Sequence, residues 1–352
     1  MAEARIAPGE LRGFGAGALV ALGVPHDDAA LVADSLVQAD LWGHQSHGLL
    51  RLPWYVARLR SGVMRAATDP SVLSDTGPLV LLDGHDGIGQ VLTERARLMA
   101  VERARSHGVG VVGVRNSNHF GTAMYFTRRA AADGCVAVLT TNASPAMAPW
   151  GGREKRLGTN PWSIAAPAPG GRVVAVDIAN TAVARGKVYL AKNRGEAIPE
   201  NWALTADGAP TTDPAQGVLG VILPMAGHKG YAITFLMDVL SGALTGSAVG
   251  TGVHGPYEAD ERSGCGHLFL ALDPAAFGDR AGYEARVQTL MDEVKDVPLA
   301  QGFDEVFHPG EVEDRAEAAN LAAGGVLLAE QSLTDLRALG AELGVPFPEE
   351  AA

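Results

Sequence analysis

The sequence predicts an α/β fold in which a sheet core is flanked by helical segments from both ends of the chain. Short apolar runs, typical of buried strands, alternate with segments whose apolar residues recur every three or four positions, as in helices. Both ends of the chain show only the helical pattern. The 44 glycines and 20 prolines cluster in loops between these elements, and such loops let a ligand approach the backbone closely.

The elements follow from these two patterns in chain order. The first 62 residues are expected to be helical, because apolar residues recur at helical spacing in 8–23, 27–43 and 51–62. A helix over 120–134 should end at Gly134, since glycine commonly terminates helices. The other expected elements are strand 78–83, helix 91–108, strands 109–114, 135–142, 162–167 and 173–179, helix 181–195, a turn-rich connection 198–214, a strand within 217–224, helix 230–246, strand 267–274, and helices 284–296, after 310 and 332–344.

Composition narrows the class of protein. The chain has 352 residues, enough for two or three domains, and is 47% hydrophobic and 19% charged, as globular proteins are. Its net charge of −12 disfavours nucleic acid and anionic membranes as partners, although a small anionic substrate can still bind a locally basic site. Only Cys135 and Cys265 are present and neither lies in a CxxC motif, so we expect no disulfide framework and no zinc knuckle.

Two segments bear on location. The N-terminal residues 1–15 carry charges throughout and lack an apolar core, so we expect no signal peptide there. The most hydrophobic helix, 230–246, is short and contains Asp238, so we expect a buried core helix rather than a membrane span. These features predict a cytoplasmic protein.

The pattern GxGxxG occurs twice, at Gly108–Gly113 and Gly250–Gly255. A dinucleotide fingerprint needs a strand, then the glycine turn, then a helix, so that the pyrophosphate meets the helix N-terminus. Both matches instead follow an expected helix, and neither leads into another. We therefore predict that any nicotinamide cofactor is bound without a Rossmann unit.

The segment 115–161 contains the strongest candidate for a catalytic group. His119 is expected in the first turn of a helix, beside a glycine and followed by a buried strand and a loop rich in Gly, Pro and Asn. The partial positive charge of a helix N-terminus disfavours imidazolium, so His119 should be neutral and able to accept a proton. The alternative is that His119 only caps the helix.

A second group of candidates precedes the third expected helix. Arg51 and Tyr55 are four residues apart and therefore share one helix face, where a guanidinium can bind a carboxylate through two hydrogen bonds. Ser46 and His47 lie at the helix entrance, suited to hydrogen-bonding a substrate oxygen. The alternative is a helix cap and a surface arginine. His44 and His47 also form an HxxH pair, but no third metal ligand is apparent nearby, so we expect no metal.

Three further loops are candidates for binding groups. The GHKG loop at 227–230 opens a helix and combines glycines with a lysine, as anion sites do; the alternative is a simple helix-initiating turn. Asp177 follows a strand and is expected to bind ribose hydroxyls, to orient a histidine, or only to cap a helix. His308-Pro309-Gly310-Glu311 reads by itself as a turn and a cap.

Taken together, these segments resemble the malate/L-lactate dehydrogenase family that lacks a Rossmann fold. This family includes sulfolactate and ureidoglycolate dehydrogenases and the piperideine/pyrroline-2-carboxylate reductases. The matching segments run in family order from about residue 40 to 311: SHGLLRLPWY, SNHFGTAMYF, APWGGREKRLGTNP, VDIANTAVARGK, GAPTTDP, LPMAGHKGYA and PGE. Each motif is weak alone, but seven in order are specific.

The resemblance implies a non-Rossmann NAD(P)-binding core with a mixed sheet, a homodimer, and hydride transfer at the α-carbon of a small carboxylic acid, with NAD or NADP as cofactor. It implies catalytic roles for His119, His47 and Ser46, and substrate contacts from Arg51, Tyr55 and Thr159. The implied cofactor contacts are His119, Gly121, Ala143, Asn160, Asp177, Ile178, Ala179, His228, Lys229, Gly230, His308, Gly310 and Glu311. The expected division is a helical segment 1–75 packed with 310–352, a substrate-side domain of 76–118 and 270–309, and an NAD(P)-binding domain of 119–269.

Two positions depart from the family pattern. The usual aspartate–x–alanine–threonine–serine run is DIANT here, with Asn180 and Thr181, which affects details of cofactor contact. The cyclic-imine reductases are expected to carry an aspartate after Gly186, where this chain has Lys187. This difference favours a 2-hydroxy-acid dehydrogenase of the malate, lactate or sulfolactate type.

Three alternatives stay open at this point. The first is a reductase of cyclic 2-imino acids on the same fold. The second is a metal-dependent hydrolase that uses His44, His47 and His119. The third is a non-catalytic anion-binding protein built on the glycine loops.

Overall fold

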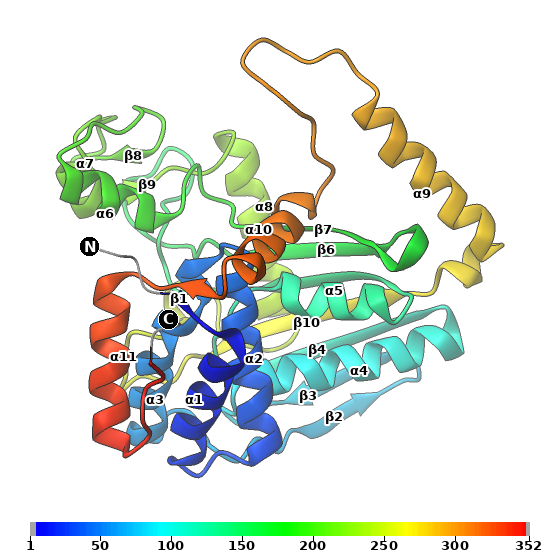
Figure 1. Cartoon of the computed structure of the whole chain (residues 1–352), viewed down its shortest axis with the longest axis horizontal. Helices are drawn as coiled ribbons and strands as arrows, with labels where there is room; N and C mark the ends of the chain where they lie inside the picture. The colour runs from blue at the N-terminus through cyan, green and yellow to red at the C-terminus, as the bar shows by residue number, and fades with distance from the viewer. Residues whose placement is uncertain (1–4, 350–352) are drawn as a thin grey trace.

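The computed structural model describes residues 5–349 and places seven strands in one sheet (Figure 1). The order is β2-β3-β4-β10-β5-β6-β7, and every neighbouring pair is antiparallel except β3 and β4. The bounds are β2 Ser71–Asp75, β3 Leu79–Asp83, β4 Val109–Ser117, β5 Val136–Thr141, β6 Trp162–Pro167, β7 Val173–Ile178 and β10 Cys265–Leu272. The expected α/β fold with a mixed, non-Rossmann sheet is confirmed, because a Rossmann sheet is mostly parallel.

Different helices cover the two faces of the sheet. The helices α4 (Gly89–His107), which links β3 to β4, and α5 (Met124–Ala132) pack on one face. The helix α8 (His228–Asp238) and the π-helical turn that continues it, Val239–Ala243, pack against β5 and β10. Successive strand residues point to opposite faces: Leu139 joins the core under α4 and α5, whereas the hydroxyl of Thr140 bonds Ser241 of the π-helical turn.

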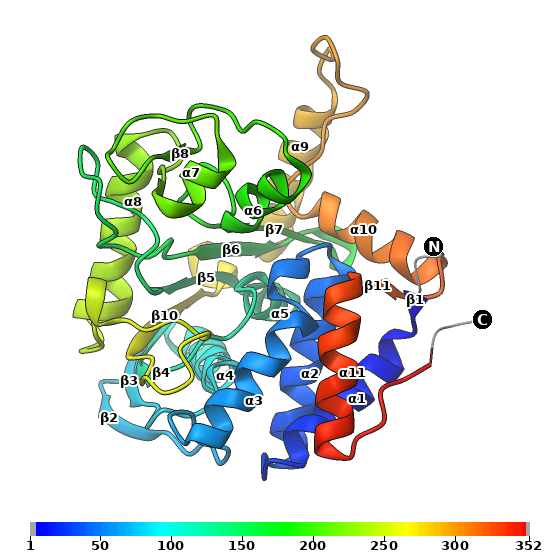
Figure 2. The same cartoon turned by 90° about the vertical axis from the view of Figure 1, so that its left-hand side faces the viewer.

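Helices from both ends of the chain pack together beside this sheet (Figure 2). They share a core that includes the fully buried Leu11, Leu36, Leu52 and Leu336. The elements of this layer are α1 Pro8–Val20, α2 His26–Leu41, α3 Leu52–Ser61, α10 Glu311–Ala322, α11 Glu330–Leu343 and the paired strands β1 Arg5–Ile6 and β11 Val326–Leu327. The prediction that helical segments from the two termini flank the sheet is thus confirmed.

Two parts of the chain extend from this body (Figure 1). One has a small core of its own, built around Val188, Ile198 and Ile222. It comprises α6 Arg185–Arg194, α7 Pro214–Leu219, β8 Ala203–Leu204 and β9 Val221–Ile222. The other is α9 (Arg280–Lys295) with the segment that connects it to α10. The short 3₁₀ turns are Gln45–His47, Leu49–Arg51, Pro169–Gly171, Gly250–Gly252 and Pro274–Phe277.

The glycines of both GxGxxG patterns have structural uses. Gly108 ends α4 in the left-handed conformation, and β4 follows directly. A Cβ on Gly110 would overlap the carbonyl oxygen of Ala100, so this glycine lets β4 pack tightly on α4. Gly250 opens a 3₁₀ turn that leads into a loop. Neither pattern sits between a strand and a helix, as predicted.

The expectation of a buried helix over 230–246 is wrong. The side chains of Phe235, Leu236 and Leu244 are 50%, 56% and 64% exposed. The segment carries large apolar residues on more than one side, with Asp238 buried among its neighbours, and the sheet covers only one side. Hydrophobicity alone does not tell whether the other sides are covered by the same chain or by another one.

Within residues 5–349, no helix has both the length and the apolar composition that crossing a bilayer requires. The proposed division into a substrate-side and an NAD(P)-binding domain stays a prediction.

A buried carboxyl group anchors the turn between α2 and α3. Oδ2 of Asp40, near the end of α2, accepts a hydrogen bond from the backbone N–H of Leu49 at 2.9 Å. A Cβ on Gly48 would overlap the Asp40 carboxyl, so glycine is required at this position. Burial raises the pKa of Asp40 to about 7, although the Leu49 hydrogen bond opposes this shift.

Asp40 should therefore give stability an unusual pH dependence. Between about pH 4 and 7 the folded chain holds a proton on Asp40 that the unfolded chain has released, so this group's contribution to stability falls as pH rises. The slope is up to about 1.4 kcal/mol per pH unit. Asp40→Asn keeps an oxygen acceptor for Leu49 but does not titrate. In urea unfolding, the free energy of unfolding of Asp40→Asn relative to the wild type should increase from pH 5 to pH 8. If the difference in unfolding free energy between the two proteins is the same at both pH values, this assignment is contradicted.

Candidate active site

His119 lies in the loop that joins β4 to α5. The expectation that it sits in the first turn of a helix is wrong, because α5 begins only at Met124. Gly121 adopts a left-handed conformation (φ +84°), which a right-handed helix does not continue through. The helix-dipole argument for a neutral His119 therefore does not apply.

Burial and neighbouring cations keep His119 neutral instead. Its pKa is lowered well below the usual value, mainly by burial and then by the positive charges that His47 and Arg51 can carry. The rings of His47 and His119 are stacked, with centroids 5.8 Å apart. Nδ1 of His119 lies 2.7 Å from the hydroxyl of Tyr55, which is itself buried, and accepts a 3.3 Å bond from the N–H of Gly121.

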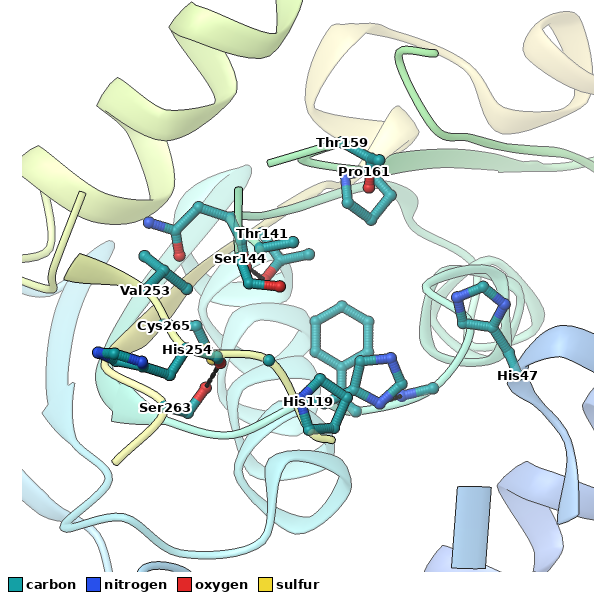
Figure 3. Close-up of a pocket in the computed structure, with 16 residues that line it drawn as sticks. His47, His119, Thr141, Ser144, Thr159, Pro161, Val253, His254, Ser263 and Cys265 are labelled. Atoms are coloured by element: carbon teal, nitrogen blue, oxygen red, sulfur yellow. Dashed lines mark hydrogen bonds between the residues drawn. The ribbon is translucent and has the colours of Figure 1, made fainter. Parts of the chain in front are cut away.

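His119 lines two cavities. The smaller one, of about 100 Å³, is bounded by His47 and by residues at the ends of β5 and β6 (Figure 3). Thr159 and Pro161 lie across this cavity from His119, and Ala143 and Gly121 also line it. The larger one, of about 610 Å³, is lined by Arg51, Trp54, His119, Arg185, Gly186, Tyr189, Pro256 and Tyr257. The histidine therefore contacts two separate spaces.

Arg51 is held in position by a backbone carbonyl and an aromatic ring. Its Nε donates a 2.6 Å hydrogen bond to the carbonyl of Ser46, and its guanidinium lies 4.1 Å from the ring centre of Trp54. Among residues 5–349 no carboxylate forms an ion pair with it. The hydroxyl of Ser46 in turn lies 2.9 Å from Nδ1 of His47. The structure thus brings together Ser46, His47, Arg51 and His119, and leaves the guanidinium available to an anion.

Tyr55 and Asn160 take different positions from those expected. Tyr55 contacts His119 rather than the larger cavity, so a direct contact with the substrate's carboxylate is not supported by its position. Asn160 is fully buried: Oδ1 accepts from the N–H of Ala143 at 2.9 Å, and Nδ2 donates to the carbonyl of Thr234 at 2.9 Å. It ties the loop after β5 to α8.

Asp177, at the end of β7, caps a helix, but not the one that follows it. Its Oδ2 accepts from the hydroxyl of Thr122 at 2.6 Å and from the N–H of Met124 at 2.9 Å, at the start of α5. The neighbouring Ile178 pairs with Trp162, and Ala179 is exposed. This carboxylate therefore fixes the position of the His119 loop relative to β7.

The GHKG loop opens a helix as predicted. Gly227 has φ +65° and precedes α8, whose first residues His228 and Lys229 are exposed. A Cβ on Gly230 would overlap the carbonyl of Met225, so the loop folds back tightly. Among the described residues, Lys229 has no ion-pair partner.

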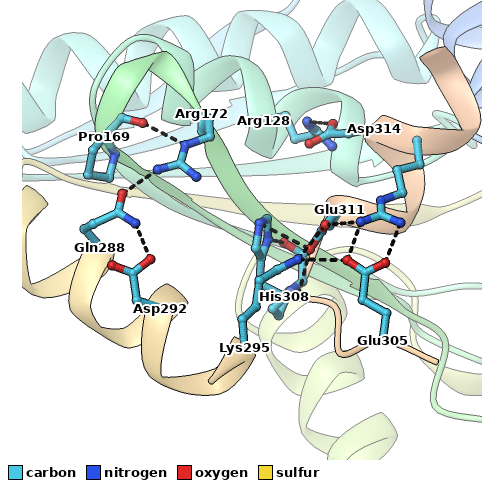
Figure 4. Close-up of polar contacts among 12 residues, drawn as sticks. Arg128, Pro169, Arg172, Gln288, Asp292, Lys295, Glu305, His308, Glu311 and Asp314 are labelled. Carbon is cyan, nitrogen blue, oxygen red and sulfur yellow. Dashed lines mark hydrogen bonds and ion pairs between the residues drawn. The ribbon is translucent and has the colours of Figure 1, made fainter. Parts of the chain in front are cut away.

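The turn at 308–311 packs against β7 (Figure 4). The carbonyl of Pro309 accepts from the N–H of Ala175 at 3.2 Å, and Gly310 lies against the same strand residue. Partial burial opposes ionisation of Glu311, but hydrogen bonds from Lys295 (2.7 Å) and Arg315 (2.8 Å) lower its pKa to about 2. The side chain of His308 lies 3.4 Å from the same carboxylate.

The cofactor segments expected from the sequence lie together in space. The 308–311 turn packs against β7, and Asp177 lies near the end of the same strand. The backbone of Asn180, just after β7, accepts from the N–H of Met225, just before the GHKG loop. The sequence suggested each segment separately, whereas the sheet edge at β7 brings them together.

Several residues of the site were not found from the sequence. His267 is buried, with Nδ1 2.8 Å from the hydroxyl of Thr141 and Nε2 2.6 Å from that of Ser117. Gln90 donates to Tyr55. Arg58 is buried and its guanidinium donates to Oδ1 of Asn118, the residue before His119, at 3.0 Å. The sequence carried a usable signal for it, since an arginine three residues after Tyr55 lies near the same face of a partly apolar helix. No such signal marks His267 and Gln90 in the sequence, because each lies in a strand or helix pattern that is also typical of core residues.

The three histidines proposed as metal ligands do not converge. His44 lies 3.4 Å from the hydroxyl of Thr122 and 3.3 Å from the carboxylate of Glu313, whereas His47 stacks on His119. Within the described part of the chain, no group of three His, Cys, Asp or Glu side chains could hold a metal ion.

Comparison with known proteins gives a consistent result. The family model described as malate/L-lactate dehydrogenase matches residues 6–337. The L-sulfolactate dehydrogenase of Methanothermobacter thermautotrophicus is 41% identical over 327 residues, covering 93% of this chain and 94% of that protein. The (2R)-3-sulfolactate dehydrogenase (NADP(+)) of Chromohalobacter salexigens is 40% identical, covering 78% and 81%. The ureidoglycolate dehydrogenase (NAD(+)) of Escherichia coli K12 is 35% identical, covering 83% of each.

Solved structures agree with these sequence matches. The sulfolactate dehydrogenase of Methanocaldococcus jannaschii has a TM-score of 0.93 at 37% identity, covering 97% of this chain and 98% of that one. The Δ1-piperideine-2-carboxylate reductase of Pseudomonas syringae pv. tomato has a TM-score of 0.84 at 27% identity, covering 95% and 99%.

The stacked histidines should resist protonation in the free protein. Burial, then Arg51 and His44, lower the pKa of His47 to about 3, and the pKa of His119 is also well below its usual value. Their NMR ring signals should therefore stay those of neutral imidazole from pH 8 down to pH 5.5, with His→Gln variants providing the assignments. Since an unfolded histidine takes up a proton near pH 6.5, these residues also lower stability as pH falls below that value. A titration midpoint between pH 6 and 7 for either ring would contradict this environment.

Proposed function

Since the chain belongs to the malate/L-lactate dehydrogenase family and is an NAD(P)-dependent dehydrogenase, we propose that it transfers a hydride at the α-carbon of a small 2-hydroxy or 2-oxo acid. His119 is the acid and base, and Arg51 binds the substrate's carboxylate. The observation that carries this proposal is the place of His119 between two cavities, one of which is lined by Arg51, an arginine with no acidic partner in the described part of the chain.

The roles of these side chains follow from their chemistry. A planar guanidinium binds a carboxylate through two parallel hydrogen bonds and so fixes the orientation of the α-carbon. The Nε2 atom of His119 then accepts the hydroxyl proton during oxidation and returns it during reduction. A bound carboxylate also offsets the charge of Arg51, which raises the pKa of His119 when substrate is present.

The segments around β7 are suited to hold the cofactor, which accepts or supplies the hydride when bound. We assign the nicotinamide end to the cavity lined by Gly121 and Ala143, beside His119. The exposed start of α8 offers unpaired N–H groups and Lys229 to a phosphate. Asp177 and the 308–311 turn lie at the neighbouring strand edge.

The larger cavity favours a substrate with two anionic groups. Arg185 lines it together with Arg51, its guanidinium lies over the ring of Tyr189, and among residues 5–349 it has no carboxylate partner. Two unpaired guanidiniums in one cavity suit an acid with a second carboxylate or a sulfonate, as in the relatives named for sulfolactate.

The test is oxidation of NADH and NADPH, followed at 340 nm, with pyruvate, oxaloacetate, 2-oxoglutarate, sulfopyruvate and Δ1-piperideine-2-carboxylate as substrates. We expect turnover of an open-chain 2-oxo diacid or sulfonate, which also identifies the preferred cofactor. Turnover of only the cyclic imine would assign the chain to the reductase branch instead. Inactivity with every substrate and both cofactors would overturn the proposal.

We also propose a homodimer. The exposed apolar residues of α8 and its π-helical turn lie on the sheet face opposite α4. A second exposed apolar set lies on α9 and the connection to α10, namely Leu290, Val297, Leu299 and Phe303. Contiguous exposed apolar residues on a projecting arm suit a contact with a second copy.

The mass in solution checks the dimer. We expect about twice the chain mass of 36.5 kDa by sedimentation equilibrium, and Leu236→Glu should shift the protein toward the monomer. Leu98→Glu provides the control, since Leu98 is equally exposed but lies on α4 across the sheet. A monomeric wild type would rule the dimer out.

We propose a cytoplasmic location, because both cysteines, Cys135 and Cys265, are buried free thiols, as is usual in reducing compartments. Recovery of the protein from a periplasmic or secreted fraction would contradict it.

Loss of the histidine should affect chemistry more than binding. His119→Ala should lower kcat by ~10²-fold or more, because the proposed acceptor of the hydroxyl proton is lost, while the Kd for the cofactor changes little. Steady-state kinetics and cofactor fluorescence titration measure the two effects. His107→Ala, at the exposed far end of α4, is the matched control. An unchanged kcat in His119→Ala would remove the acid–base role.

The arginine should govern substrate affinity. Arg51→Lys should raise the KM for the 2-oxo acid by about tenfold, since an ammonium group cannot reproduce the paired hydrogen bonds. Arg60→Lys, on the exposed side of α3, serves as control. If KM is the same in both variants and the wild type, the carboxylate binds elsewhere.

A further inference from the structure

Gln90 has a buried amide oxygen that finds no hydrogen-bond partner among residues 5–349. It is the second residue of α4 and is fully buried. Its Nε2 donates a 3.1 Å hydrogen bond to the hydroxyl of Tyr55, but its Oε1 has no partner. An unpaired buried amide oxygen is costly and rare, so its retention here calls for an explanation.

Gln90, Tyr55 and His119 form a single row of hydrogen bonds. The Tyr55 hydroxyl lies 3.1 Å from Nε2 of Gln90 and 2.7 Å from Nδ1 of His119. Gly89 makes this possible, because a Cβ at that position would overlap the carbonyl of Asn118 and push α4 away from the His119 loop.

The direction of one bond in the row sets the direction of the next. With the amide nitrogen toward Tyr55, the hydroxyl donates to Nδ1 of His119, and the neutral ring carries its proton on Nε2. With the amide turned by 180°, Oε1 accepts the hydroxyl proton and the hydroxyl oxygen accepts Nδ1–H. Nε2 then has a free lone pair.

Both amide orientations are accessible in this cavity. The two ends of an amide are nearly the same in size, so turning Gln90 changes the packing little. Each orientation pairs one end with Tyr55 and leaves the other without a partner. The turned orientation also gives up the 3.3 Å bond that Nδ1 accepts from the N–H of Gly121, so the two orientations differ by this one long hydrogen bond.

Only the turned orientation suits proton transfer at Nε2. The titratable groups that face His119 are His47 and Arg51 from the segment before α3, Arg58 from α3 and His267 from β10, and a positive charge on any of them disfavours imidazolium. Among residues 5–349 no carboxylate bonds this ring. The row through Tyr55 is then the means by which the imidazolium is stabilised, since its Nδ1–H donates to Tyr55 and the hydroxyl donates to Oε1.

We propose that Gln90 is a positioning residue that selects, through Tyr55, which nitrogen of His119 carries the proton. This inference rests on the proposed function for its catalytic meaning. In oxidation, the substrate's O–H bond breaks and its proton bonds to Nε2 of His119, while the hydride leaves the α-carbon for NAD(P)⁺ and the C=O bond forms. Nδ1 keeps its proton throughout, held by Tyr55 and the amide oxygen of Gln90.

Two substitutions at Gln90 should act in opposite directions. Gln90→Glu supplies only acceptor oxygens when ionised, and in that state Nδ1 should carry the proton. The lower pH inflection of kcat/KM for oxidation should then rise by about one unit or more. Gln90→Met, of similar size, leaves Tyr55 only Nδ1 as an acceptor. Nε2 should carry the proton, and kcat/KM should fall by about tenfold or more with a lower inflection.

The direct readout is the ¹⁵N chemical shift of the two His119 ring nitrogens in the free protein, labelled at histidine. We expect the protonated nitrogen to be Nδ1 in Gln90→Glu and Nε2 in Gln90→Met. Thr93→Val removes a different buried polar group from α4, a hydroxyl that donates to the carbonyl of Gly89. The tautomer of His119 in this variant should be that of the wild type. In a Tyr55→Phe background, Gln90→Met should have no further effect.

Each outcome decides the proposal. The same His119 tautomer in folded Gln90→Glu and Gln90→Met would overturn it, as would equal pH profiles. If Gln90→Glu does not fold, the near-isosteric Gln90→Met and its dependence on Tyr55 give the decision. Because the ¹⁵N readout needs no substrate, a tautomer change without any turnover would retain the role of Gln90 and reject the proposed function instead.

Discussion

The site depends on one buried amide, that of Asn118, the residue before His119. Its Nδ2 donates to the carbonyls of Asp86 and Gly87, and its Oδ1 accepts from the guanidinium of Arg58 at 3.0 Å. These bonds join the end of β4 to the turn before α4 and to α3. An amide that uses both its ends in this way fixes the backbone on either side of it, so His119 has a defined position although it lies in a loop.

The two terminal helical segments have a functional use in this arrangement. They form a layer with its own core, and α3 with the 3₁₀ turn before it brings Arg51, Tyr55 and Arg58 to the end of the sheet. The turn that precedes α3 is held by the Asp40 carboxyl. In the proposed function, the substrate side of the site is thus built on helical segments and the cofactor side on strand ends, with His119 between them.

Burial and nearby cations keep His119 neutral. This has a consequence for catalysis, because a ring that resists protonation in the free protein is a weak base. An anion bound at Arg51 removes part of that resistance. The proposed roles of Arg51 and His119 would therefore couple substrate binding and proton transfer through one guanidinium.

The sequence alone determined the α/β class, the flanking helices, the absence of a Rossmann fingerprint, and the grouping of Ser46, His47, Arg51 and His119. These depend on local patterns: apolar spacing, glycine placement and short motifs that keep their order along the chain. Only the tertiary structure decided that α5 starts after His119, that the helix from His228 is exposed on one side, and that Gln90 and His267 belong to the site. Those features depend on contacts between segments far apart in sequence, and a glutamine that faces a catalytic histidine has the same local pattern as one that faces the core.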